Sequence, residues 1–236
     1  MEDLKAWLNS HADSIGNVVD FNAATDRLYP FDFTAQNGEL TEDILKNTLV
    51  FSEWVTSKLE GSGCRYGIGG YNEHRTIYTR SSHFDTDEEP RRLHLGVDIW
   101  AKAGTPVYNF YDAEVSSFHF NDHFGDYGAT IILKYNLDGL VLHVLYGHLS
   151  LSSLKGLYEG KLISGGKRFA AFGIPEENGH WPPHLHMQLI LDMGGQKGDY
   201  PGVCQFSKKE VYLQNCPDPE LILRYTFGQA IRSPFI

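Results

Sequence analysis

The stretch His184–Leu191, with the sequence HLHMQLIL, alternates polar and apolar side chains over its first six residues. Side chains of a strand point alternately to opposite faces, so this pattern predicts a β-strand with one polar and one apolar face. The polar face carries His184, His186 and Gln188. The apolar face can pack into a core, and the two histidines should therefore project together.

A second stretch, Leu93–Ile99, follows the same alternation about ninety residues upstream. His94 and Asp98 share one face, and Gly96 between them leaves room for an ion. Two histidines and a carboxylate suit a catalytic zinc site, which uses three protein ligands and keeps its fourth position for water. A chain with 11 histidines can contain one histidine pair by chance. The alternation in both stretches is what favours a metal site.

A third histidine, His148, follows the apolar strand expected over residues 140–146. A period of two places Tyr146 and His148 on one face, so we expect His148 where an apolar strand face meets a polar cavity. The three stretches could converge on one site. The motifs HExxH, GxSxG, GxGxxG and the P-loop do not occur, so competing chemistries have little support.

Bulk composition narrows the class of protein. The chain has 236 residues, enough for one good-sized core, and a formal net charge of −10, which argues against a nucleic-acid or anionic-membrane partner. Its cysteines, Cys64, Cys204 and Cys216, form no CxxC pair and predict neither a disulfide framework nor a zinc ribbon. The N-terminus resembles no signal peptide and no apolar run could span a bilayer, so we expect a cytoplasmic protein. A trimmed periplasmic or secreted protein would look the same.

The pattern of elements predicts a mainly β fold with an N-terminal helical segment. Helices are expected over residues 2–18, over 41–60 with Thr41 as the N-cap, and over 220–225. Residues 31–40 should form a loop, and residues 136–139 a hairpin turn. The expected strands are residues 105–111, 114–120, 130–135, 140–146 and 184–191. We divide the chain into a helical segment (1–63), a β-rich domain (64–215) and a C-terminal tail with a short helix (216–236).

The ordered set His94-x-x-x-Asp98, Tyr146-Gly147-His148 and His184-x-His186 resembles the lysostaphin-like (LytM-type) zinc metallopeptidases. Gly104-Thr105-Pro106-Val107 also matches that family, and the resemblance covers about residues 90–191. It implies a duplicated hybrid motif, an antiparallel β sandwich with a groove, and makes residues 64–215 the peptidase domain. It implies one Zn²⁺ per chain, bound by His94, Asp98 and His186. His148 and His184 would be the catalytic pair, and peptidoglycan peptides the substrates.

Departures from the family pattern leave the substrate open. Trp181 stands before the last motif, where it would lie near the groove and reshape it, and Tyr146 would also line it. A narrower resemblance, carried partly by Tyr71–Arg75, is to a branch fused with kinase-like and class III aminotransferase domains. That branch makes a small amide as plausible a substrate as a wall peptide. Asn72 and Glu73 could lie across the groove and occlude it, although a simple turn explains Asn72 better.

Three functions remain open at this stage. The first is a zinc-dependent peptidase or amidase in which His148 or His184 acts as general base, and retention of all five site residues favours it. The second is a binding module that keeps the fold and the metal. The third is an oligomer with zinc at an interface. Manganese, nickel or iron could replace zinc, and the sequence leaves the oligomeric state undetermined.

Overall fold

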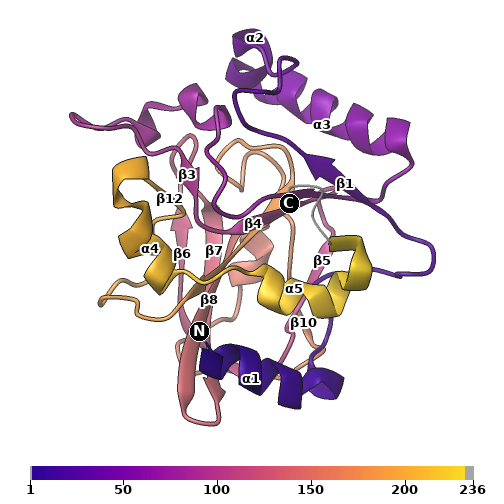
Figure 1. The fold of residues 1–236 in the computed structure, drawn as a ribbon, viewed down its shortest axis with the longest axis vertical. Coiled ribbons are helices and arrows are strands. Elements are labelled where there is room, and N and C mark those ends of the chain that lie inside the picture. The colour runs from indigo at the N-terminus through magenta and orange to yellow at the C-terminus, as the bar shows by residue number, and fades with distance from the viewer. Residues whose placement is uncertain (1, 232–236) are drawn as a thin grey trace.

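The computed structural model describes residues 2–231, which are built around one eight-stranded sheet (Figure 1). Its strand order is β1-β2-β4-β11-β8-β7-β6-β9. All neighbours pair antiparallel except β1 and β2, which run parallel. The strands of this sheet are β1 (Leu28–Phe31), β2 (Tyr66–Gly69), β4 (Val97–Trp100), β6 (Ala113–Asn121), β7 (Gly128–Leu137), β8 (Leu140–Leu149), β9 (Leu162–Ile163) and β11 (His184–Ile190). The predicted mainly β fold with an N-terminal helical segment is confirmed.

Two short two-stranded sheets complete the β structure. One joins β5 (Pro106–Tyr108) to β10 (Arg168–Ala171), and the other joins β3 (Leu93–His94) to β12 (Val203–Cys204). The expected strand over residues 105–111 is therefore shorter than predicted. The other four predicted strands are present with shifted ends.

The predicted hairpin turn between β7 and β8 is confirmed. Its two central residues, Asp138 and Gly139, have φ of 54° and 94°, as a two-residue hairpin of type I′ requires. Helix α1 (Glu2–Ser10) contacts this turn, because the Trp7 Nε1–H donates to Asp138 Oδ2 at 2.9 Å.

The N-terminal helix is shorter than the predicted 2–18. It ends at Ser10, followed by a 3₁₀ turn over Ala12–Ser14. The Ser10 hydroxyl donates to the Trp7 carbonyl at 2.9 Å, and such local side-chain bonds compete with a continuing helix.

The predicted helix over 41–60 is two helices, α2 (Glu42–Lys46) and α3 (Thr48–Ser62). Thr41 caps α2 as predicted. Asn47 interrupts the run because it adopts a non-helical conformation and its side chain accepts from Leu49 N and Val50 N. Gly63, with φ of 66°, ends α3 in the left-handed conformation that favours glycine.

The N-terminal segment shares both the sheet and a core with the rest of the chain. Strand β1 begins inside this segment and pairs with β2, so the predicted loop begins after Phe31. The rings of Phe31, Phe33 and Phe51 pack around Trp100 of β4 in one aromatic cluster. At the other end of the chain, α4 (Lys209–Asn215) precedes α5 (Glu220–Phe227), which confirms the predicted short C-terminal helix.

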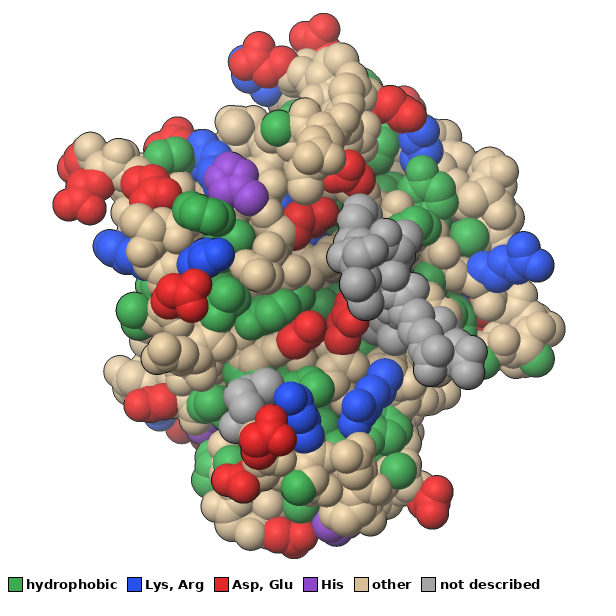
Figure 2. Space-filling model, in the orientation of Figure 1, with side chains coloured by type: hydrophobic (Ala, Val, Ile, Leu, Met, Phe, Trp, Pro, Cys, Tyr) green, Lys and Arg blue, Asp and Glu red, His purple; other side chains and the backbone are tan. Residues whose placement is uncertain are grey.

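The surface carries charges of both signs. Figure 2 shows acidic and basic side chains interspersed over the visible face, with apolar atoms between them. Within residues 2–231, the helices are all too short or too polar to cross a membrane.

Candidate metal centre and its cavity

Strand register brings the predicted metal ligands together at the centre of the sheet. In the antiparallel pairing of β4 with β11, Asp98 lies opposite His186. His94 comes from β3, just before a break in the strand at Leu95 and Gly96. A side chain at Gly96 would place its Cβ 2.6 Å from His186 Cε1, so only glycine leaves room for that ring.

The three donor atoms of these residues form a tight triangle. His94 Nε2 lies 2.9 Å from His186 Nδ1, and Asp98 Oδ1 lies 3.0 Å from His186 Nδ1 and 3.3 Å from His94 Nε2. All three residues are buried. Tetrahedral zinc with bonds of about 2.0–2.1 Å needs ligand atoms roughly 3.3 Å apart. The spacing therefore fits one small divalent ion.

Outer hydrogen bonds orient both histidine ligands. His94 Nδ1 faces the Gly70 carbonyl at 2.9 Å, and His186 Nε2 faces Gln188 Oε1 at 3.0 Å. The Gln188 amide donates to the Pro201 carbonyl, which fixes its oxygen toward His186. Since both outer nitrogens face acceptors, they carry the protons, and two nitrogen lone pairs face each other inside the triangle. A shared cation would satisfy both.

The predicted catalytic histidines lie beside this triangle. His148 Nδ1 faces the Asn178 carbonyl and His184 Nδ1 faces the Pro182 carbonyl, each at 2.7 Å. Their ring centroids are 4.1 Å apart, and both rings line one cavity with Asp98 and His186. Each Nε2 therefore carries a lone pair that is available for proton transfer.

Burial keeps His94, His148 and His184 neutral. It lowers the pKa of His94 to about 3, with a further contribution from Arg75, and that of His184 to about 4. Burial and the neighbouring His184 hold the pKa of His148 well below its usual range. Burial alone would raise the pKa of Asp98, but the positive charge of Arg75 opposes this and holds the pKa well below its usual range, so the carboxylate stays ionised.

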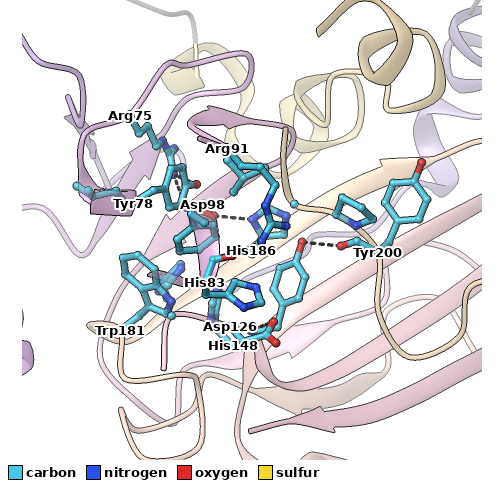
Figure 3. Close-up of a pocket in the computed structure, with 18 of the residues that line it drawn as sticks. Arg75, Tyr78, His83, Arg91, Asp98, Asp126, His148, Trp181, His186 and Tyr200 are labelled. Atoms are coloured by element: carbon cyan, nitrogen blue, oxygen red, sulfur yellow. Dashed lines mark hydrogen bonds and ion pairs between the residues drawn. The ribbon is translucent and has the colours of Figure 1, made fainter. Parts of the chain in front are cut away.

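The cavity beside the donors is small and largely aromatic (Figure 3). It measures about 140 Å³. Trp181, the predicted groove residue, lines it and is only 3% exposed. Trp100 stacks on His184 with ring centroids 4.0 Å apart. The other aromatic lining residues are Tyr78, Phe84, Tyr127 and Tyr200.

Tyr146, also predicted to line the groove, does not reach the cavity. Its ring is fully buried in the main core, where its hydroxyl bonds that of Tyr135 at 2.7 Å. The expectation that Tyr146 and His148 share a face is wrong because His148 has a φ of 60°. This left-handed residue breaks the period of two and turns the imidazole to the cavity side.

Asn72 and Glu73, the predicted occluding pair, do not line the cavity either. Asn72 is exposed and has a φ of 56°, as in the turn interpretation. The Glu73 carboxylate accepts from Arg75 Nε. The residue that does approach the metal ligands from this segment is Arg75, whose Nη1 donates to Asp98 Oδ2 (Figure 3).

Sequence reasoning missed Arg75 and assigned no role to Gln188 or Trp100. Gln188 was detectable, since it lies two residues after His186 on the same strand face. Arg75 gave no comparable indication, because an isolated arginine is mostly found on the surface.

Part of the chain is similar to known peptidases. Residues 92–198 match the family model described as "Peptidase family M23". The catalytic domain of lysostaphin from Staphylococcus simulans is similar, with 22% identity over 73% of this chain and 97% of that one and a TM-score of 0.44. A zinc-containing peptidase from Vibrio cholerae gives 26% identity over 42% and 27% of the chains and a TM-score of 0.33. Csd3 from Helicobacter pylori gives 22% identity over 61% and 36% and a TM-score of 0.36.

No match was found among the curated proteins. The five residues predicted to bind metal and to catalyse, which are His94, Asp98, His148, His184 and His186, all lie inside the segment that matches the family model. The match therefore supports the M23 peptidases as the family of residues 92–198.

Proposed function

We propose that this protein is a zinc-dependent hydrolase that cleaves a peptide or small amide bond. The observation that carries the proposal is the triangle of buried donor atoms 2.9–3.3 Å apart, with two neutral histidines beside it. Structural zinc sites are usually closed by four protein ligands, whereas three donors beside a cavity match a catalytic site.

The chain's own residues divide the work of hydrolysis. His94, Asp98 and His186 would hold the ion, which supplies a Lewis acid and a water with a pKa near 7. His148 and His184 are neutral, so the Nε2 of one can accept the proton that water loses. The same nitrogen can return that proton to the leaving amine. Before it releases the proton, that protonated Nε2 can also donate a hydrogen bond to the developing oxyanion.

Two substrate classes fit this chemistry. Peptidoglycan-type peptides are the default suggested by the M23 match, and the lysostaphin in the comparison is named an antimicrobial peptidase. A small amide is the second candidate, in keeping with the resemblance to the fused branch. The observation that favours it is the cavity of about 140 Å³, below the roughly 300–1,000 Å³ of typical ligand pockets.

The decisive experiment measures zinc per chain by elemental analysis in wild type, Asp98→Ala and His186→Ala. We expect about one zinc in wild type and loss in both variants, since each removes one of three ligands. His119→Ala, at an exposed position, is the matched control and should keep its zinc. A wild-type protein that binds no zinc after incubation with it would refute the proposal. Turnover assays with peptidoglycan peptides and small amides then separate the two substrate classes.

A further inference from the structure

Arg75 is fully buried, and its guanidinium donates hydrogen bonds to Asp98, Glu73 and the Gly70 carbonyl. Its Nη1 donates to Asp98 Oδ2 and its Nε donates to Glu73 Oε2, both at 2.5 Å. Its Nη2 donates to the Gly70 carbonyl at 3.1 Å. A Cβ at Gly69 would lie 2.8 Å from this Nη2, so the neighbouring strand makes room for the guanidinium.

The two carboxylate oxygens of Asp98 therefore have different partners. Oδ1 faces His94 and His186, whereas Oδ2 is taken by Arg75. A free carboxylate can bind an ion through one oxygen or through both. With Oδ2 held by a charge-assisted hydrogen bond, only Oδ1 remains for the ion.

Residues 70–75 also contact a second predicted metal ligand, His94. The Gly70 carbonyl accepts from both Arg75 Nη2 and His94 Nδ1. Glu73 accepts from Nε of the same guanidinium and places a second negative charge beside it. Residues 70–75 thus fix two of the three predicted ligands from outside the segment that matches the M23 family model.

We propose that Arg75, anchored by Glu73, is a positioning residue that occupies Oδ2 of Asp98, so that Asp98 would bind an ion through Oδ1 alone. This inference rests on the proposed metal site. Direct binding of substrate by Arg75 is a poorer explanation, because the guanidinium is 0% exposed and its donors are already engaged.

Cobalt(II) in place of zinc tests this directly, because its visible absorption is strong in four-coordinate sites and weaker at higher coordination number. The variants are R75K, R75M and E73Q. We expect R75M to lose absorption intensity as Oδ2 becomes a second ligand. Lysine cannot reach Asp98, Glu73 and Gly70 together. We therefore expect R75K to bind zinc about 10–100-fold more weakly, as is usual when an outer partner is changed.

The matched control is R80M, which removes another buried arginine whose Nη2 bonds Thr48. It should leave the cobalt spectrum and zinc affinity unchanged. E73Q retains an acceptor for Arg75 and should fold even where R75M does not. We expect E73Q to weaken zinc binding less than R75K.

The outcomes separate the two proposals. If wild type binds neither zinc nor cobalt, the metal site itself fails. If wild type binds both, and R75K and E73Q keep the wild-type spectrum and affinity, the role of Arg75 is overturned while the hydrolase proposal stands.

Discussion

At the residue scale, the backbone of His148 is the unusual feature of the site. Its φ of 60° is uncommon for a residue with a side chain, and its N–H and carbonyl are both held, by the Tyr127 carbonyl and the Gly173 N–H. Strained residues of this kind cluster at functional sites, where surrounding contacts hold them in place. The conformation here delivers the imidazole to the cavity beside His184.

His148→Ala should reduce turnover about 10²–10⁴-fold, the usual contribution of a positioned acid or base. Its zinc content should stay near wild type, because His148 is outside the donor triangle. His143→Ala on the same strand, outside the cavity, is the control. Near-normal turnover of His148→Ala, or loss of its zinc, would contradict the assigned role.

Gly96→Ala should displace the His186 ring and abolish zinc binding. The added Cβ would meet His186 Cε1 at 2.6 Å and the Met187 carbonyl at 2.7 Å, and the latter is backbone that cannot turn away. Gly61→Ala, where a Cβ meets nothing within 4 Å, should keep its zinc. Elemental analysis of both variants checks this, and full zinc content in Gly96→Ala would show that the site tolerates the shift.

At the scale of elements, helix α3 supports the site indirectly. Phe51 packs against Trp100, and Trp100 stacks on His184, so a chain of aromatic contacts runs from α3 to a predicted catalytic residue. The N-terminal segment is therefore part of the core behind the cavity.

Phe51→Ala should lower the free energy of unfolding by about 3–5 kcal/mol, because it leaves a cavity in a buried cluster. Leu49→Ala on the same helix is the control, since Leu49 is 66% exposed and should change stability little. Urea unfolding of both variants is the measurement. Equal, small effects would mean that α3 adds nothing to this core.

At the scale of the whole molecule, the buried histidines make stability depend on pH. Their pKa falls from 6.5 to about 3 for His94 and about 4 for His184 in the folded metal-free protein. Between those values the unfolded chain binds more protons, so acid favours unfolding. Each histidine should contribute up to about 1.4 kcal/mol per pH unit.

We therefore expect the metal-free protein to lose stability as the pH falls from about 6.5 toward 4, because the buried histidines outnumber Glu220, whose pKa burial raises to about 7 and which opposes part of the loss. Denaturant titrations in the presence of a chelator, at several pH values across this window, provide the test. A free energy of unfolding that stays constant there would show that these histidines are not buried in neutral form.

The sequence contained enough to predict most of the sheet and the three converging metal donors. Alternation is a local property, and it places Asp98 and His186 correctly on regular strands. His94 reaches the same site although its strand breaks at Leu95 and Gly96. Alternation misplaced Tyr146 because one left-handed residue reverses the faces. It could not find Arg75, whose partner Asp98 is 23 residues away and becomes adjacent only on folding. The pairing of β1 with β2 has the same long-range origin.

The two outer strands of the sheet carry a last consequence. Strand β1 contains Pro30, which has no N–H to offer, and β9 is only two residues long. A long unpaired edge would invite strands from other chains, and prolines and very short edge strands are devices that discourage this. The edges therefore protect the protein against aggregation by strand addition, independently of the chemistry at its centre.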